Sequence, residues 1–408
     1  MTNRNRSILW GLLAVAAVAY LWWITTGWST NVVAQGDALV YRAGSLAWLD
    51  GHEVYTERLN LELGAGSMFF TYGPLALLLF VPLAVLPLSA AFVALAVVSW
   101  LFLLGALVLW CRALGLGRRD AWLVGLAATV VASATGPVID HLGYGQVNSL
   151  LLLLATIDLL MPRTRLPRGV LLGLAIAIKL TPAALLLLPL LRRDWRTIIV
   201  AGATAVVGIA ASWVIVPKEA GYFWFTAVRD PGRVGNLRSP ANQSIRAVFE
   251  RWIDGPLGGA LWLGAALVVV AFVSLAVVTV LLPRGDTVGA AAVVFVLPAL
   301  LSPVAWTHHW VWSLPLLVWL VDLGRRGSRG AIALAVAGFL VLTFFPITSF
   351  DPVRLIPNTP EWSAVDATMA GGYVYWVLIA LLAVPWLRPT APVELPDRSD
   401  DAAAQPVG

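Results

Sequence analysis

The residues that could do chemistry in this sequence lie mostly in short polar segments between long apolar stretches. In the first such segment, Asp37 is followed four residues later by Tyr41 and then by Arg42. On a helix, this spacing places Asp37 and Tyr41 on one face, where the carboxylate could act as a general base on a substrate hydroxyl. The alternative is a structural role, because Asp is a favoured N-cap residue and an apolar helical pattern follows it.

A second polar segment, residues 140–148, contains Asp140, His141, Gln146 and Asn148. Gln and Asn side chains each offer a hydrogen-bond donor and an acceptor, which suits them to bind hydroxyl groups. The alternative is a polar turn whose groups bond only to one another.

Lys179 lies inside an apolar run and is followed by Leu180, Thr181 and Pro182. A lysine at membrane depth is costly and indicates a functional site with a partner. The alternative is that its side chain extends to a nearby interface. Because Pro182 interrupts the helix at this point, the functional interpretation is favoured.

The segment 217–256 contains four arginines around the sequence Asn242-Gln243-Ser244. They are Arg229, Arg233, Arg238 and Arg246. A guanidinium group matches the geometry of a phosphate, so these arginines are candidate ligands of an anionic substrate. Phospholipid headgroups are the alternative partners. We interpret the match of residues 242–244 to a glycosylation signal as chance.

Two adjacent histidines, His308 and His309, lie between Trp306 and Trp310. Imidazole can donate a hydrogen bond to a phosphate or to a leaving-group oxygen. A zinc site is disfavoured, because adjacent helical histidines diverge and no acidic ligand lies nearby. The tryptophans alone are also typical of a membrane interface.

The composition predicts that these segments are positioned by membrane-embedded helices. Of 408 residues, 60% are hydrophobic and 12% are charged, about half the charged share of a soluble domain. Stretches of about 20 apolar residues can cross a bilayer. The candidates are 8–27, 68–87, 88–114, 121–139, 147–162, 169–191, 197–216, 257–283, 287–304, 310–323, 330–346 and 372–388. The sequence therefore predicts an all-α polytopic membrane protein with about a dozen spans, the first of them retained rather than cleaved.

Basic clusters between the apolar stretches predict the orientation. They are Arg118-Arg119, the segment from Arg163 to Arg168, Arg192-Arg193 with Arg196, Arg284, and Arg325-Arg326 with Arg329. The positive-inside rule places these clusters and both termini in the cytoplasm. The loops at 28–67, 140–146, 217–256, 305–309 and 347–371 then lie on the opposite face, with nearly all the unusual polar residues.

Two regions resist a plain alternation of spans. Strict alternation through 68–138 would place Arg118-Arg119 outside, and the stretch 169–191 is basic at both ends. A broken or re-entrant segment in each region would restore the balance, although twelve plain crossings remain an alternative. We expect a single transmembrane domain over residues 1–388 and a disordered cytoplasmic tail at 389–408.

The charge and cysteine content exclude several other classes. The net charge is +5, but no basic run exceeds three residues, so we expect basic membrane anchors and no nucleic-acid partner. The single cysteine, Cys111, excludes an internal disulfide and a cysteine-based metal cluster.

The sequence resembles glycosyltransferase family 87, the polyprenyl-phospho-sugar-dependent membrane transferases of actinobacteria. The matching motifs occur in family order: Asp37 with Tyr41-Arg42, Phe70-Thr71-Tyr72-Gly73-Pro74, Gly145-Gln146-Val147-Asn148, Lys179-Leu180-Thr181-Pro182, Asn242-Gln243-Ser244, and Ser302-Pro303 through His308-His309-Trp310. One departure is Gly73, where relatives typically have proline.

The resemblance implies a C-type glycosyltransferase fold of about 11–13 transmembrane helices and an inverting reaction with a lipid-phosphate sugar donor. It implies no cofactor and no obligatory metal. Asp37 would be the general base, and His308 and His309 would contact the donor phosphate, helped by Lys179 and the four arginines. The residues expected to bind the sugar or the acceptor are Tyr41, Arg42, Tyr72, Asp140, His141, Gln146, Asn148, Asn242, Gln243 and Trp306.

Within the family, the resemblance favours a polyprenyl-phosphate-mannose donor and a glycolipid or lipoglycan acceptor at the periplasmic face. The implied product is an α-1,2-mannosyl linkage in phosphatidylinositol mannoside or lipomannan assembly. A decaprenyl-phospho-arabinose-dependent arabinofuranosyltransferase is the alternative within the family. A non-catalytic lipid-carrier flippase is the alternative of another class. It would explain the spans, Lys179 and the arginines but not Asp37, and a transporter should also place essential charges at midplane on paired broken helices.

Overall fold

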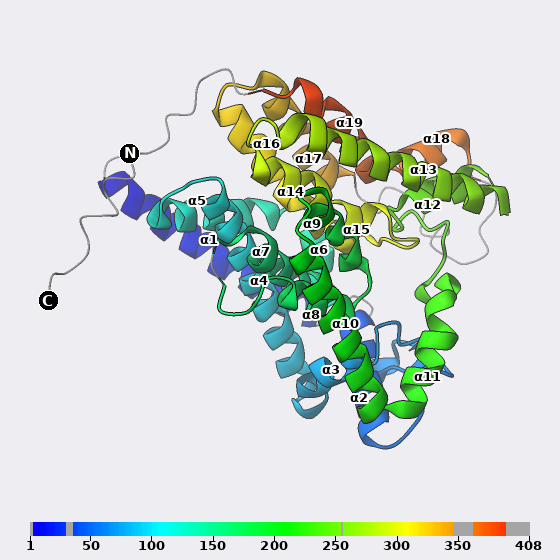
Figure 1. Ribbon diagram of the computed structural model, residues 1–408. Helices are drawn as coiled ribbons and strands as arrows, with labels where there is room; N and C mark the ends of the chain where they lie inside the picture. The colour runs from blue at the N-terminus through cyan, green and yellow to red at the C-terminus, as the bar shows by residue number, and fades with distance from the viewer. Residues whose placement is uncertain (1–2, 30–35, 163, 254–255, 346–361, 389–408) are drawn as a thin grey trace, which may run out of the picture.

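Helices form nearly all the regular structure of the protein in this computed structural model, which describes residues 3–29, 36–162, 164–253, 256–345 and 362–388 (Figure 1). The α-helices are α1 (Asn3–Ser29), α2 (Gly36–Leu49), α3 (Leu75–Val85), α4 (Leu88–Ala113), α5 (Arg118–Ala132), α6 (Gly136–Gly143), α7 (Asn148–Leu160), α8 (Val170–Ile178), α9 (Leu187–Leu191), α10 (Trp195–Ile215), α11 (Pro217–Phe225), α12 (Ile245–Trp252), α13 (Pro256–Ala276), α14 (Thr287–Phe295), α15 (Leu297–Leu300), α16 (Leu314–Arg325), α17 (Arg329–Phe344), α18 (Ala364–Met369) and α19 (Gly372–Ala383). Shorter helical turns are η2 (Glu62–Gly64), η3 (Thr181–Leu186), η4 (Ala227–Arg229), η5 (Pro231–Val234), the π-helical η6 (Val277–Leu281), η7 (Thr307–Ser313) and η10 (Val384–Trp386). A two-stranded antiparallel sheet pairs β1 (Leu59–Asn60) with β2 (Ser67–Met68).

Each of the twelve apolar stretches expected from the sequence contains at least one helix among its described residues. Within the described ranges, four helices are long and apolar enough to cross a membrane: Asn5–Thr26, Leu88–Ala113, Trp195–Ile215 and Leu257–Leu281. The bent pair α5 and α6 would make a fifth span. The remaining apolar helices have 10–17 residues, because prolines and polar segments interrupt them. The protein is a helical membrane protein, and the number of 11–13 crossings stays a prediction.

Both regions that resisted plain alternation contain broken helices. The axes of α5 and α6 differ by 84°. The helix α8 ends at Ile178, and Lys179 is extended with φ −149° and ψ 132° before η3 begins. The expected break at residues 179–182 is therefore present.

Small residues and buried hydrogen bonds hold the helices together, as expected where lipid offers little hydrophobic contrast between helices. A Cβ atom on Gly173 of α8 would lie 2.4 Å from the carbonyl oxygen of Ala201 on α10, so these two backbones touch. The indole nitrogen of Trp110 on α4 donates to Thr156 Oγ1 on α7 at 3.1 Å. These contacts pack α4, α7, α8 and α10 into one framework.

The polar loops expected on the outer face contain several helices that lie wholly or partly outside the twelve apolar stretches. They are α2, α6, α11, α12 and α18. In Figure 1, α2, α3 and α11 lie together beside one end of α10, and direct contacts join α2 to α3 and α10 to both α3 and α11. The predicted tail at 389–408 and residues 347–361 of the last outer loop lie outside the described residues.

Cysteine labelling tests the predicted orientation. In a Cys111→Ala background, we expect Thr226→Cys to react with an impermeant thiol reagent from outside intact cells and Arg329→Cys to react only after permeabilisation. Both positions are exposed, whereas Cys111 is buried. Labelling of Arg329→Cys alone in intact cells would reverse the orientation.

Candidate active site

Tyr72, in the segment between β2 and α3, lies at the centre of a buried hydrogen-bond network. Its hydroxyl accepts from Tyr41 at 2.9 Å and from the Lys179 ammonium at 3.1 Å, and it donates to Gln146 Oε1 at 2.9 Å. Tyr72 is 6% exposed. One hydroxyl therefore joins α2, the α6–α7 connection and the break after α8.

Asp37 forms one end of this network. Gln146 Nε2 donates to Asp37 Oδ2 at 2.5 Å. The carboxylate lies in the first turn of α2, where the helix dipole favours a negative charge. Burial raises the pKa of Asp37 to about 6, although the Gln146 hydrogen bond and the charge of Lys179 act to lower it. A partly buried carboxylate with a pKa near neutrality is suited to accept a proton.

Lys179 lies on the other side of Tyr72. Its ammonium is 3.2 Å from Asn148 Oδ1 and 3.0 Å from His309 Nε2, in addition to the Tyr72 hydroxyl. An ammonium group has three donors and no acceptor. When it is protonated, His309 must accept through Nε2 and carry its own proton on Nδ1. The extended backbone after α8 thus directs a cation into the site rather than to an interface.

His308 and His141 are buried beside this cation. The rings of His308 and His309 are nearly perpendicular, at 89°, with centroids 4.6 Å apart. Within the part of the chain that the structure describes, neither ring nitrogen of His308 or of His141 has a hydrogen-bond partner. Since buried polar groups are normally paired, these nitrogens are available to a ligand. Burial lowers the pKa of both His308 and His309, so they are neutral donors or acceptors at pH 7.

Asp140 and Thr307 join the two polar segments directly. The hydroxyl of Thr307 donates to Asp140 Oδ2, which connects α6 to η7. This contact holds His141 and His308 on facing elements, and the carboxylate of Asp140 is engaged in it.

Two other candidates bond to backbone. Asn242 Oδ1 accepts from Ala305 N at 2.9 Å, and Gln243 Nε2 donates to Ala370 O at 2.5 Å. The ring of Trp306 lies so close to Gly235 that a Cβ atom there would be 2.6 Å from it. These contacts fix the segment leading to His308, so a role of Asn242, Gln243 and Trp306 in binding sugar stays a prediction.

The candidate arginines differ in their partners and in their exposure. Arg233 donates to Tyr55 O at 2.5 Å, and Arg246 pairs with Glu250 at 3.0 Å. Arg229 is exposed at the end of η4, and Arg238 is partly buried. The partners described for Arg233 and Arg246 are not members of the Tyr72 network.

Arg42 points away from Asp37 along the same helix. Its guanidinium pairs with Glu62 at 2.7 Å and donates to the carbonyl groups of Ala84 at 3.0 Å and Leu86 at 2.7 Å. The carbonyl groups at the C-terminal end of a helix have no partner within the helix, so Arg42 caps α3. Its predicted contact with the acceptor remains untested.

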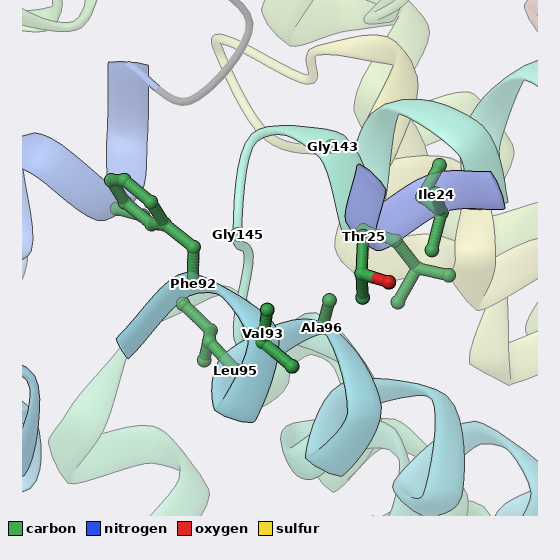
Figure 2. A pocket seen from close by; sticks show the side chains of 10 residues that line it. Ile24, Thr25, Phe92, Val93, Leu95, Ala96, Gly143 and Gly145 are labelled. Carbon is green, nitrogen blue, oxygen red and sulfur yellow. The ribbon is translucent and has the colours of Figure 1, made fainter. Parts of the chain in front are cut away.

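Glycines allow the close approach of the segments that carry Asp37 and Gln146. Gly145 has φ +74°, and a Cβ atom there would lie 2.7 Å from the Cβ of Ala38, next to Asp37. Figure 2 shows Gly143 and Gly145 on the connection that passes the end of α1 and the start of α4. The small cavity there, about 20 Å³, has room for about one water molecule. Similarly, a Cβ on Gly73 would lie 3.2 Å from Ala177 O, so the backbone after Tyr72 lies close to α8.

Sequence reasoning missed two buried residues behind the site. Tyr55 donates from its hydroxyl to Tyr72 O at 2.7 Å. Arg251 on α12 is 2% exposed and donates to the carbonyl oxygens of Ser239, Asn242 and Ala370, each at 3.0 Å. Both act through backbone groups, which leave no pattern in the side-chain sequence.

Comparison with known proteins identifies the family. The model of glycosyltransferase family 87 matches residues 70–303, which include Tyr72, Gln146 and Lys179. The chain belongs to this family. It is therefore a membrane glycosyltransferase, and Asp37 and the two histidines flank the matched segment.

Relatives cover nearly the whole chain. The polyprenol-phosphate-mannose-dependent alpha-(1-2)-phosphatidylinositol mannoside mannosyltransferase of Mycolicibacterium smegmatis is 35% identical over 398 residues, covering 91% of this chain and 88% of the relative. The protein of the same name from Mycobacterium tuberculosis is 33% identical over 411 residues, covering 95% and 92%. An alpha-(1->3)-arabinofuranosyltransferase of Corynebacterium glutamicum is 26% identical over 356 residues, covering 83% and 78%. The family predicted from the motifs is thus confirmed.

Proposed function

We propose that this protein is an inverting α-1,2-mannosyltransferase that transfers mannose from a polyprenol-phosphate donor to a phosphatidylinositol mannoside. The observation that carries the proposal is the network from Asp37 through Gln146 and Tyr72 to Lys179 and His309. It places a candidate base at one end and a cation with imidazoles at the other. The two mycobacterial relatives, named for this activity, support the choice of donor and acceptor.

The reaction needs a base on the acceptor and charge stabilisation on the donor. Asp37 accepts the proton of the acceptor hydroxyl while that oxygen attacks the anomeric carbon of mannose. The bond from this carbon to the phosphate oxygen breaks, and the polyprenyl phosphate departs with the electron pair. Lys179, His308 and His309 stabilise the charge that develops on that phosphate. Because base and leaving group act on opposite faces of the sugar, the configuration at this carbon inverts.

The network also supports pre-organisation of the base. Gln146 donates to Asp37 and accepts from Tyr72, so its amide has a single orientation. Tyr72 in turn accepts from Lys179, which leaves its proton for Gln146. The base and the phosphate-binding cation are therefore held in one fixed relation before substrate binds.

An apolar groove of about 330 Å³ supports a lipid-linked donor. Segments η3, α9, α10, α13 and α15 line it, with Ala183, Ala184 and Leu301 among the lining residues. Ala183 follows Lys179 by four positions and Leu301 precedes His308 by seven, so segments adjacent in sequence to both phosphate-binding residues line the groove. We assign this groove to the prenyl chain of the donor.

Filling the groove should weaken donor binding. We expect Ala184→Trp to raise the KM for the polyprenyl donor about tenfold. This change corresponds to about 1.4 kcal/mol less binding free energy. Ala203→Trp, on the exposed face of α10, is the matched control and should leave this KM unchanged. A normal KM in Ala184→Trp would remove the prenyl chain from this groove.

The face of the membrane follows from the predicted orientation. The first outer loop carries Asp37, and the segment 305–309 carries the histidines, so we place catalysis on the extracytoplasmic side. This placement depends on the labelling pattern expected for Thr226→Cys and Arg329→Cys.

Transfer of arabinose is the second candidate, supported by the similarity to the arabinofuranosyltransferase of Corynebacterium glutamicum. Purified protein should be incubated separately with radiolabelled polyprenyl-phosphomannose and polyprenyl-phosphoarabinose, each with phosphatidylinositol mannoside. We expect label in the glycolipid only from the mannose donor. Label from arabinose alone would establish the second candidate, and label from neither donor would contradict both.

A further inference from the structure

Tyr55, in the first outer loop, lies directly behind the central tyrosine of the site. Its side chain is 0% exposed, and its hydroxyl donates to Tyr72 O at 2.7 Å. The ring packs against Phe70, with centroids 5.5 Å apart, and against Phe223 on α11, at 5.2 Å. Tyr55 therefore bonds to the backbone of the residue whose hydroxyl joins both halves of the network.

Two charged residues of the outer loop at 217–256 hold the backbone of Tyr55. Glu219 on α11 is 9% exposed, and its Oε2 accepts from Val54 N at 3.2 Å and Tyr55 N at 3.3 Å. Arg233 on η5 donates to Tyr55 O at 2.5 Å, and its guanidinium lies 4.0 Å from the centroid of the Phe69 ring. In Figure 1, α11 lies beside the end of the molecule that contains α2 and α3. One amide and one carbonyl of Tyr55 are thus bonded to buried or partly buried charges, which form strong hydrogen bonds.

The backbone next to Tyr72 also meets α8. A Cβ on Gly73 would lie 3.2 Å from Ala177 O and 3.7 Å from Ile178 O, so the backbone of residues 72–73 lies against the last turn before Lys179. Tyr55 and the last turn of α8 therefore both contact the backbone of residues 72–73. Loss of the Tyr55 hydroxyl would allow the Tyr72 hydroxyl to shift relative to Gln146 and Lys179.

We propose that Tyr55 is a positioning residue for glycosyl transfer, held by Glu219 and Arg233 so that the two outer loops together set the place of the Tyr72 hydroxyl. This inference rests on the proposed function, because it requires the Tyr72 network to be catalytic. It gives Arg233 a role through Tyr55, distinct from a contact with the donor phosphate.

A double-mutant cycle tests the inference. Tyr55→Phe removes only the hydroxyl, and we expect kcat to fall about tenfold, equivalent to about 1.4 kcal/mol in the barrier. In a Tyr72→Phe background, the same change should alter kcat by less than about twofold, because the group that Tyr55 positions is already lost. The melting temperature, by contrast, should fall by similar amounts in both backgrounds.

The matched control is Tyr373→Phe. Tyr373 is also buried, and its hydroxyl also donates to a backbone carbonyl, that of Leu342 at 3.3 Å. This variant should lose stability as Tyr55→Phe does and keep its kcat. Arg233→Met should lower kcat as Tyr55→Phe does, with unchanged affinity for polyprenyl-phosphomannose.

Three results would each overturn the inference: a normal kcat in Tyr55→Phe, equal losses of kcat from Tyr55→Phe in both backgrounds, or an Arg233→Met effect confined to donor affinity. Each of them leaves the proposed function standing if Tyr72→Phe is impaired. A normal kcat in Tyr72→Phe would instead contradict the catalytic role of the network itself.

Discussion

Asp37→Asn is expected to fold, to bind the donor lipid and to transfer mannose about 10²–10⁴-fold more slowly than the wild type, the usual contribution of a general base. Asn has the size of Asp and caps helices equally well, so a purely structural Asp37 would be replaceable. The Asn amide can still bond to Gln146, but it cannot accept a proton from the acceptor. Expression, melting temperature, donor binding and transfer should be measured on one preparation.

The matched control for this variant is Asp50→Asn. Asp50 directly follows α2 and is exposed, so the same chemical change at that position should leave transfer unchanged. Substantial transfer by Asp37→Asn would move the role of base to another carboxylate, and Asp140 would be the next to test.

The pH dependence gives a second readout of the same base. Because burial raises the pKa of Asp37 to about 6, the carboxylate is ionised at pH 7 and becomes protonated as the pH falls through that value. We expect kcat/KM to fall tenfold per pH unit well below this pKa. Asp50→Asn should reproduce the wild-type profile. A profile that stays flat well below pH 5 would contradict a base with this pKa.

Lys179→Met is expected to cause the other large loss. Methionine preserves the length of the side chain but removes the three donors shared by Tyr72, Asn148 and His309. A charge-stabilising group at a developing anion contributes about 10²–10³-fold to kcat, so we expect a loss of this size together with weaker donor binding. A lysine that only reached toward lipid headgroups would lack this effect.

The stability of Lys179→Met separates function from folding. Burying a charge is costly, and an apolar side chain of similar volume is often tolerated or stabilising. We therefore expect a melting temperature at or above that of the wild type, with activity lost. Lys218→Met on the exposed side of α11 is the control. If Lys179→Met unfolds the protein instead, the lysine is a structural link between α8 and its neighbours.

Each motif allowed both a functional and a structural interpretation. The contacts between segments distinguish the two. Asp37 was compatible with a helix cap, and it does lie in the first turn of α2, but its carboxylate bonds to Gln146, 109 positions away. Lys179 was compatible with an interfacial lysine, yet its ammonium is held among three side chains of the site. Asn242 and Gln243 suited a sugar, and their amides bond to backbone.

The sequence by itself determined the membrane-embedded helices, the break at residues 179–182 and the membership of glycosyltransferase family 87, whereas the place of the bend within 68–138 came from the structure. The length of an apolar stretch, the presence of a proline and the order of the motifs can all be read from the sequence without knowledge of any tertiary contact. Tyr41, Gln146, Asn148, Lys179 and His309 were identified as polar residues inside or between apolar runs, and Tyr72 was identified through its family motif.

Only the tertiary structure decided which of these polar residues share hydrogen bonds. Tyr72 meets Gln146 and Lys179 because α2, α6, α8 and η7 converge, and the hydrogen bonds between them span up to 130 positions of the chain. Tyr55, Glu219 and Arg251 could not be found earlier, since they bond to backbone groups that every residue carries. Side-chain type reveals which residues can do chemistry, whereas the packing of helices at membrane depth selects the ones that do it together.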